Sequence, residues 1–591
     1  MRRTYFANKN KNMKILPFNS KMISSCVNKI NRKTGEKSAR FLVPLIVLLL
    51  VLPCSCNYLD YTETSNYTKD EIFLEFGRVH AALDNIYSYL PDYFLPIDGS
   101  TRACATDEAE QVLSTSSVQK FNDGSWDASN TVDDVWADMY TGIRAVNFFL
   151  VNIEGQTFPL QKYQTDYAQQ QAGAAFWPYE ARFLRAFFYF ELVKRYHNVP
   201  LVTKVLTPEE ANTVVPGSFN DVVNFIISEC DAVIPNLPAS YATAGVGYLN
   251  ETGRATRGTA QALKARMLLY AASPLYNTSN DLQKWSDAAK AAKVIIDGGL
   301  YSPLPDYSTI LNNLTSKELI FERRLVSAEN YFEAANFPIG YEGGNTGTCP
   351  SQNLVDAYEM KTTGLDINAP GSGYDPAYPY VDRDPRLAAT IIYNGSAWKG
   401  LPVQIWYGGK NAPPKVNATK TGYYLKRYVV EAVNLAEGQT TTAKHNGVIF
   451  RYGEVLLNYA EAMNEAYGPE AAGPAPLTMT ALTAVNLIRT RAGMPVFSPG
   501  MSQAAFRTKL RNERRVELAF EDHRFWDIRR WKIGNTTTAI YGVDVAKDAS
   551  NNITYTRKLV EQRVWNDRMY FYPIPLGEIY INSKLTQNPG W

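Results

Sequence analysis

The segment that most constrains the fold is EARFLRAFFYFELVKRYHNVPLV, residues 180–202, because its apolar residues fall on nearly every side of a helical wheel. A helix of this kind has no polar face to turn toward solvent, so neighbouring helices have to enclose it. Pro200 cannot continue the helix, and the sequence VPLV around it predicts an extended segment. The segment therefore predicts a helical scaffold with this helix in its interior.

Further helices are predicted along the chain. Residues 255–277 and 285–301 form one pair, and residues 451–468 and 482–495 form another, with glycines placed to cap helix ends. These segments are rich in Ala, Leu and Tyr and resemble tetratricopeptide units, although no strict 34-residue period is present. The charge-dense segment at residues 511–532 is predicted to be the last major helical element. We expect a scaffold of stacked antiparallel helix pairs.

Helical periodicity fades between residues 301 and 450. Gly, Pro, Asn and Tyr are frequent there, in stretches such as YEGGNTGTCP and APGSGYDPAYPY, which are typical of loops. A compact protein keeps long irregular loops mainly for function. We therefore expect the binding function in this loop-rich region.

The N-terminal segment predicts export and lipidation. Residues 41–52 are twelve apolar residues after a basic stretch, too short for the roughly 20 residues that span a bilayer but typical of an export signal. The PCSC that follows resembles a bacterial lipobox, which needs a small residue before the lipidated cysteine. Ser55 precedes Cys56, whereas the restrained ring of Pro53 precedes Cys54. We predict lipid on Cys56, with Cys54 as the alternative, and cleavage to a secreted soluble protein as a further one.

Each buried methylene of an acyl chain contributes about 0.8 kcal/mol to membrane binding, and two or more chains anchor a protein stably. A lipidated Cys56 would therefore hold the protein permanently at a membrane. The expected location is the envelope of a Gram-negative-type cell. The predicted regions are a signal peptide (1–55), a tether (56–68), an N-terminal helical region (69–300), a loop-rich insertion (301–450) and a C-terminal helical region (451–591).

Charge and chemistry argue against several classes of function. Sixty basic and 58 acidic residues give a net charge of +2 without a basic stripe, so we expect no nucleic-acid partner. Cys104, Cys230 and Cys349 are widely spaced and predict neither a disulfide framework nor a zinc site. The four histidines are distant from one another, and no HExxH, GxSxG or P-loop motif occurs. We predict no catalytic residues, metal or cofactor.

Two acidic segments could be mistaken for catalytic sites. ATDEAE, residues 105–110, supplies the paired carboxylates that a glycosidase needs, but we interpret this short run as solvated surface. Glu517, Glu521 and His523 could form an acid–base site within residues 511–532. We prefer a structural ion-pair network there, because acidic and basic residues interleave at helical spacings: Glu513, Glu517 and Glu521 with Arg514, Arg515 and Arg524.

Aromatic and polar residues occur together in the candidate ligand-binding segments. The chain has 38 Tyr and 10 Trp, whose rings can cover the apolar faces of sugars, while Asp, Asn and Arg can bind hydroxyls. This combination occurs in residues 93–110 and again in the loop-rich region. The predicted ligand-binding residues are Asp98, Arg102, Trp126, Tyr331, Tyr341, Trp398 and Trp406, with Tyr374 and Tyr407 in the same loop set. We assign Trp136, Trp285, Trp526 and Trp531 to the scaffold.

An ordered series of motifs carries a resemblance to a known family. From Cys56 to Trp591, the chain resembles the SusD/RagB family of outer-membrane nutrient-binding lipoproteins. The resemblance implies a mainly α fold, in which four right-handed tetratricopeptide-like helix pairs carry a large irregular loop-rich ligand-binding region. The motifs are CNYLD, EARFLRAFFYFELVKRYHNVPLV, ALKARMLLYAASPLYN, VDAYEM, RDPRL, RYGEVLLNYAEAMNEA, RNERRVELAFEDHRFWDIRRW and YFYPIPLGEIYINSKLTQNPGW.

The same resemblance implies a function without chemistry. The protein would bind an oligosaccharide, a peptide or a similar nutrient at the cell surface and act as a lid on a SusC-type TonB-dependent outer-membrane transporter. Two alternatives stay open, a surface lipoprotein glycoside hydrolase and a structural assembly factor for the transporter.

Overall fold

The computed structural model describes residues 67–242, 251–310, 313, 315–324 and 327–591. The chain divides into two compact units, Met1–Glu71 and Ile72–Trp591. The predicted signal peptide, Cys54, Cys56 and all but the last two residues of the predicted tether lie outside the described residues. Helix α3 (Lys69–Phe73) begins the described helices.

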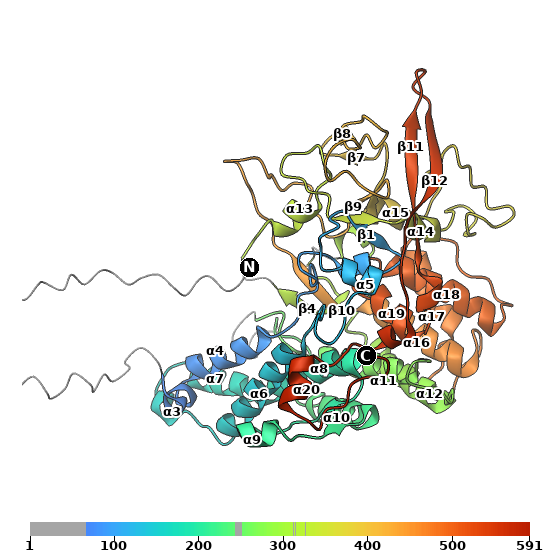
Figure 1. The fold of residues 1–591 in the computed structure, drawn as a ribbon. Helices are drawn as coiled ribbons and strands as arrows, with labels where there is room; N and C mark the ends of the chain where they lie inside the picture. The colour runs from blue at the N-terminus through green and yellow to red at the C-terminus, as the bar shows by residue number, and fades with distance from the viewer. Residues whose placement is uncertain (1–66, 243–250, 311–312, 314, 325–326) are drawn as a thin grey trace, which may run out of the picture. The chain divides into compact units, whose positions relative to one another are not determined.

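The longer helices of the second unit pack in series (Figure 1). Helix α4 contacts α6 and α8, α8 contacts α10, α10 contacts α11, α11 contacts α12, α12 contacts α16, and α16 contacts α17. The mainly helical fold is thus confirmed. Their bounds are α4 (Phe76–Tyr87), α6 (Trp136–Ile153), α8 (Trp177–Tyr196), α10 (Phe219–Val233), α11 (Arg257–Ala272), α12 (Leu282–Asp297), α16 (Tyr452–Tyr467) and α17 (Ala481–Arg491).

Helix α8 is enclosed as its sequence predicts, with apolar and charged side chains buried on all sides. It ends at Tyr196, before Pro200 is reached, because His197 adopts a φ of +65°, which a right-handed helix cannot continue. Val199–Pro200 then form strand β2, which pairs with β3 (Pro216–Gly217). The expected extended segment is therefore present.

Side-chain caps begin several of these helices. The Ser218 hydroxyl accepts a hydrogen bond from the Asp221 amide at the start of α10, and Thr256 caps α11 in the same way. Asp281 accepts from the Gln283 amide at the start of α12. Each cap satisfies an amide that the first turn of a helix leaves without a partner.

The other α-helices in the described part of the chain include α18, which is as long as α10, and several shorter ones. They are α5 (Gln119–Asp123), α7 (Tyr167–Ala174), α9 (Pro208–Ala211), α13 (Tyr331–Asn336), α14 (Gln352–Ala357), α15 (Pro385–Thr390), α18 (Gln503–Glu517), α19 (Arg524–Arg530) and α20 (Leu576–Ile581).

The predicted helical element at residues 511–532 is two helices, α18 and α19. Phe520 and Asp522 separate them with φ values of +62° and +68°. An L-residue in this left-handed region ends a right-handed helix. The expectation of one continuous helical element is therefore corrected.

The strands that the structure describes form two-stranded sheets, and four of these sheets include strands of the loop-rich region. Strand β1 (Ala109–Gln111) pairs antiparallel with β5 (Thr348–Pro350), and the β11–β12 hairpin projects from the body (Figure 1). The described pairs are β1–β5, β4–β10, β11–β12, β2–β3, β6–β9 and β7–β8. The remaining bounds are β4 (Leu319–Arg324), β6 (Ile391–Ile392), β7 (Ala397–Trp398), β8 (Leu401–Pro402), β9 (Tyr424–Leu425), β10 (Asn446–Arg451), β11 (Ala539–Lys547) and β12 (Ile553–Gln562).

The hydrophobic core runs from the helices into the loop-rich region as one large cluster. The four tryptophans assigned to the scaffold are each no more than 4% exposed, and three of them belong to this cluster, which confirms the assignment. They are Trp136, Trp285, Trp526 and Trp531.

Candidate functional site

The two predicted aromatic regions meet in the structure. The Phe94 ring lies 5.7 Å from the Phe332 ring of α13 and 5.8 Å from the imidazole of His445. The β1–β5 pairing joins the same two parts of the chain. We use the name loop face for the exposed and half-buried side chains of these segments, namely Asp98, Tyr331, Tyr341, Trp406 and Tyr407.

The buried side chain of His445 fixes the start of α13. Tyr331, the first residue of this helix, is 38% exposed. The two ring nitrogens of His445 lie 2.9 Å from a Glu329 carboxylate oxygen and 2.8 Å from a Glu333 oxygen. Burial lowers the pKa of His445, but the two carboxylates more than offset this and raise the pKa to about 9. The histidine is therefore a cation at neutral pH and holds the two glutamates together. The Tyr331 amide donates to Glu329 at 2.6 Å.

Tyr341 is half buried, and contacts at its hydroxyl and over its ring face hold it in place. Its hydroxyl donates to the Trp398 carbonyl oxygen at 3.1 Å, and the Lys410 ammonium lies 4.4 Å from the ring centroid. Nearby, the Asn411 amide donates to the Ile339 carbonyl at 2.7 Å and ties the two loops together. A cation over an aromatic face stabilises the ring in one orientation.

Trp406 and Tyr407 lie in the same loop as Lys410. Trp406 is half buried, with the Lys547 ammonium of β11 4.8 Å from its ring centroid. Tyr407 is 75% exposed. Asp98 is exposed and accepts a hydrogen bond from the Ser117 hydroxyl at 3.1 Å. Aromatic planes and a carboxylate are thus available to a ligand from solvent.

Three predicted ligand residues are instead part of the core, which corrects the prediction for them. Arg102, Trp126 and Trp398 are 3%, 1% and 0% exposed. Arg102 pairs with Asp133 at 2.8 Å and with Asp522. The Trp126 ring packs on Trp591 and the Trp398 ring on Phe337, at centroid distances of 4.5 and 5.7 Å. Distant chain segments cover all three, so their side chains are not presented to solvent.

The acidic run at residues 105–110 is also buried, and its interpretation as solvated surface is wrong. Asp107, Glu108 and Glu110 are at most 5% exposed. Arg524 pairs with Asp107 at 2.9 Å, and Arg563 pairs with Glu110 at 2.6 Å. Guanidinium groups from the C-terminal region therefore neutralise this run in the interior.

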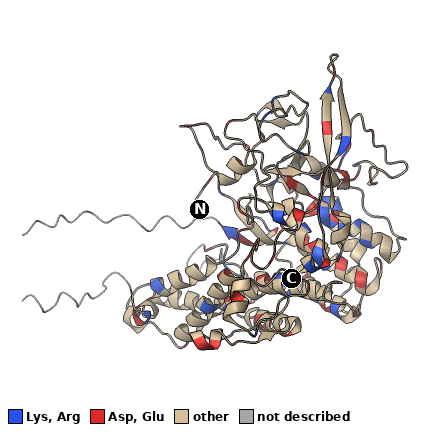
Figure 2. Ribbon diagram, in the orientation of Figure 1, with Lys and Arg blue, Asp and Glu red and all other residues tan. Residues whose placement is uncertain are grey.

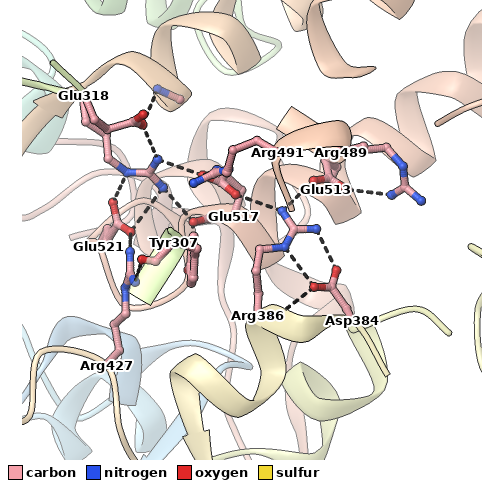
Figure 3. A network of polar contacts seen from close by, with 12 residues as sticks. Tyr307, Glu318, Asp384, Arg386, Arg427, Arg489, Arg491, Glu513, Glu517 and Glu521 are labelled. Carbon is pink, nitrogen blue, oxygen red and sulfur yellow. Dashed lines mark hydrogen bonds and ion pairs between the residues drawn. The ribbon is translucent and has the colours of Figure 1, made fainter. Parts of the chain in front are cut away.

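Figure 3 shows a second buried network of carboxylates and guanidinium groups. The Arg451 guanidinium contacts Glu318 at 3.0 Å, Glu517 at 2.8 Å and also Glu521. Six carboxylates meet five guanidinium groups and one ammonium group in this network, so its charges balance. They are Glu318, Glu359, Asp384, Glu513, Glu517 and Glu521 with Arg386, Arg427, Arg451, Arg489, Arg491 and Lys509. Figure 2 shows basic and acidic positions interleaved around α16, α18 and α19.

This network supports the structural interpretation of residues 511–532. Burial raises the pKa of Glu517, but Arg491, Arg451 and Arg386 more than offset it and hold the pKa far below its usual value. Burial, with Arg266 and Arg514 nearby, lowers the pKa of His523 well below its usual value. An ionised, enclosed carboxylate is a poor proton donor.

The ion-pair partners differ from those expected within the segment. Arg514 bonds to Asp527 at 2.8 Å, whereas Arg515 and Arg524 reach Asp107. The arginines that neutralise Glu517 come from other elements, so the network is tertiary rather than confined to one helix.

In the part of the chain that the structure describes, no group of three or more His, Cys, Asp or Glu side chains could hold a metal ion. Within the same ranges, no helix has the length and apolarity needed to cross a membrane. Cys104, Cys230 and Cys349 are free and buried.

Sequence reasoning missed the residues that hold the loop face. Lys410 and Lys547 cover aromatic ring faces, and His445 anchors α13 between two glutamates. None of the three has a local pattern that predicts its partner. Only the abundance of tyrosine in the loops indicated where ring partners would gather.

Comparisons with known proteins agree along most of the chain. Residues 317–591 match a family model described as SusD family, and residues 57–269 match one described as starch-binding associating with outer membrane. SusD-like proteins P25 and P2 of Formosa agariphila are 24% and 25% identical, over 81% and 93% of this chain and 81% and 100% of their own lengths.

Solved structures show the same likeness. A SusD-like protein from Bacteroides fragilis NCTC 9343 is 30% identical, with a TM-score of 0.72 over 88% of this chain and 98% of that chain. A second protein from that organism, called a SusD-like carbohydrate binding protein, is 28% identical, with a TM-score of 0.70 over 87% of this chain and 100% of that chain.

Proposed function

The chain belongs to the SusD family, and we propose that it is a non-catalytic cell-surface lipoprotein that binds an oligosaccharide at its loop face. The observation that carries the proposal is that aromatic rings and a carboxylate of the loop face are open to solvent. Tyr331 and Tyr407 are 38% and 75% exposed, and Asp98 is exposed. Such rings can stack on the apolar face of a sugar while a carboxylate accepts from its hydroxyls.

The loop face is preorganised for this task. His445 fixes the start of α13, and Lys410 fixes the ring of Tyr341. A site held in its binding geometry loses less entropy when a ligand binds. The carbohydrate-binding relative from Bacteroides fragilis supports a saccharide ligand, and a peptide is the second nutrient class.

We extend the proposal to location and partner. A lipid on Cys56 would anchor the protein in the outer membrane, and the family description that mentions association with the outer membrane supports this location. From there the protein would deliver its ligand to a SusC-type TonB-dependent transporter. Nucleic acid has no part in this function.

Two alternatives remain testable. A surface glycoside hydrolase would release shorter products from a candidate glycan, although Glu517 and Glu521 are buried and paired with arginines. A purely structural assembly factor would leave nutrient uptake intact after deletion of residues 325–350 and 395–410.

A glycan and peptide array tests the binding proposal. We expect the purified protein to bind at least one oligosaccharide family, and Tyr331→Ala and Tyr407→Ala each to weaken that binding about 3- to 10-fold through lost stacking. Tyr163→Ala is the matched control, because Tyr163 is an 86% exposed tyrosine of the helical region. Absence of detectable binding to every oligosaccharide and peptide on the array would overturn the proposal.

A further inference from the structure

A separate cavity of about 370 Å³ opens beneath the β11–β12 hairpin, and none of its lining residues belongs to the loop face. The hairpin supplies Tyr555 and Arg557 to one wall, and α14 supplies Gln352 and Asp356 to another. Its volume lies in the range of roughly 300–1,000 Å³ typical of small-ligand sites. We call it the tyrosine cavity because Tyr374, Tyr380, Tyr423 and Tyr555 line it.

The tyrosine rings are held in fixed planes. One face of Tyr380 stacks on Tyr393, with centroids 4.2 Å apart and an angle of 23° between planes. Tyr555 meets Tyr380 edge-on, at 5.5 Å and 86°. Tyr374 is half buried, and the Arg383 guanidinium lies 5.5 Å from its ring. The cavity therefore presents rigid aromatic surfaces whose orientation needs no adjustment.

A chain of hydrogen bonds runs along the polar wall. The Tyr380 hydroxyl lies 3.4 Å from the Tyr423 hydroxyl, which donates to the side-chain oxygen Oε1 of Gln352 at 2.5 Å. The side-chain nitrogen Nε2 of Gln352 donates to one Asp356 oxygen at 2.6 Å, and the other Asp356 oxygen pairs with Arg557. This pair joins α14 to β12 across the cavity.

The residues that line the cavity carry no net charge. Asp356 and Arg557 are the two charged residues of the lining, and they compensate each other. Their side chains are 21% and 47% exposed, so unpaired N–H groups and lone pairs stay within reach of a ligand. Such a wall suits hydroxyl groups, which both donate and accept, better than a carboxylate or sulfate.

From this combination we propose that the tyrosine cavity is a second saccharide site, which takes one uncharged sugar unit of the oligosaccharide. The inference rests on the proposed function and adds a site and a ligand charge to it. The ring face of the sugar would lie against a tyrosine, and its hydroxyls would meet Asp356, Arg557 and the Asn368 amide at the rim. An extended chain bound at both sites would gain affinity through effective concentration.

Hydrogen exchange read by mass spectrometry tests the two sites separately. The probes are maltoheptaose, cellohexaose, xylohexaose and mannohexaose, with hexagalacturonate as an acidic sugar and decaproline as a peptide. With a neutral oligosaccharide we expect protection of residues 366–380 and 553–558 at the cavity and of residues 329–345 and 404–411 at the loop face.

Single variants connect the protection to the cavity. We expect Tyr374→Ala to remove the protection of residues 366–380 and to raise the apparent Kd about 3- to 10-fold. Tyr378→Ala is the matched control, because this tyrosine of the same loop is 67% exposed and does not line the cavity. We expect it to bind as the wild type does.

The possible results separate the two proposals. Protection at the loop face alone overturns the second site and leaves the proposed function standing. Protection at the cavity by hexagalacturonate or decaproline, and by no neutral sugar, overturns the ligand assignment. Absence of protection anywhere with every probe overturns both proposals.

Discussion

Burial and the neighbouring arginines shift the pKa of Glu108 in opposite directions. Its side chain is 1% exposed, and the nearest Arg515 nitrogen is 3.6 Å from the carboxylate. Burial outweighs the pull of Arg515 and Arg524 and raises the pKa of Glu108 to about 7. Beside it, burial also raises the pKa of Asp107, but the same two arginines more than offset it and hold the pKa at about 2. The pKa values of these two adjacent carboxyls therefore differ because, of the two, only Asp107 accepts hydrogen bonds directly from a guanidinium group.

The raised pKa gives Glu108→Gln a stability change that depends on pH. A carboxyl whose pKa rises from 4.5 to about 7 on folding favours the folded state most below pH 4.5, and this contribution is lost as pH rises through 7. We expect the free energy of unfolding of the variant, relative to wild type, to increase by about 1–3 kcal/mol between pH 5 and pH 8. Urea unfolding at both pH values measures it. Exposed Glu437 supplies the control Glu437→Gln, and parallel behaviour of the two variants would contradict the assignment.

At the scale of elements, two glycines show how closely helices approach one another. A Cβ on Gly142 of α6 would lie 2.7 Å from the ring of Phe188, which is fully buried in α8. A Cβ on Gly577 of α20 would meet nothing within 4 Å. Gly142 thus permits the α6–α8 contact, whereas Gly577 has no such packing role.

Substitution by alanine should therefore have opposite effects at the two glycines. We expect Gly142→Ala to lower the free energy of unfolding by about 1–3 kcal/mol through overpacking. We expect Gly577→Ala to raise it by up to about 1 kcal/mol, because alanine favours the helix. Urea unfolding of both variants provides the measurement. A shift of the same sign and size at both positions would mean that α6 and α8 do not pack this closely.

Across the whole molecule, buried carboxylates paired with basic groups connect elements that are distant in sequence. Asp133 lies between Arg102 and Arg195, and Glu461 bonds to Arg530. Burial raises the pKa of each carboxyl, but these arginines more than offset it and hold each pKa at about 2. Glu191, paired with Lys194 and Arg195, behaves in the same way.

These pairs predict acid unfolding with a defined direction. Carboxyls whose pKa falls from 3.8 or 4.5 to about 2 on folding stabilise the protein above pH 4.5, and this contribution is lost as pH falls toward 2. We expect a cooperative loss of near-UV circular dichroism between pH 4.5 and 2. Added salt should change the midpoint little, because buried pairs are poorly screened. A native spectrum that persists at pH 2 would contradict the role of these pairs.

The sequence predicted the secondary-structure elements better than the tertiary contacts between them. The enclosed helix predicted within residues 180–202 and the helix pair predicted within 255–301 follow from local apolar periodicity. The structure contains them as α8, α11 and α12. The break between α18 and α19 was missed, because Phe520 and Asp522 adopt positive φ without a glycine to signal it.

By itself, the sequence determined the mainly helical scaffold and the loop-rich region, because both depend on periodicity and turn residues within short windows. Only the tertiary structure decided which loop aromatics face solvent, since distant segments cover Trp126 and Trp398 and leave Tyr331 and Tyr407 open. The tertiary structure also creates the tyrosine cavity, which lies between α14 and β12. Irregular segments have no periodic face, so their burial is set by whatever packs against them.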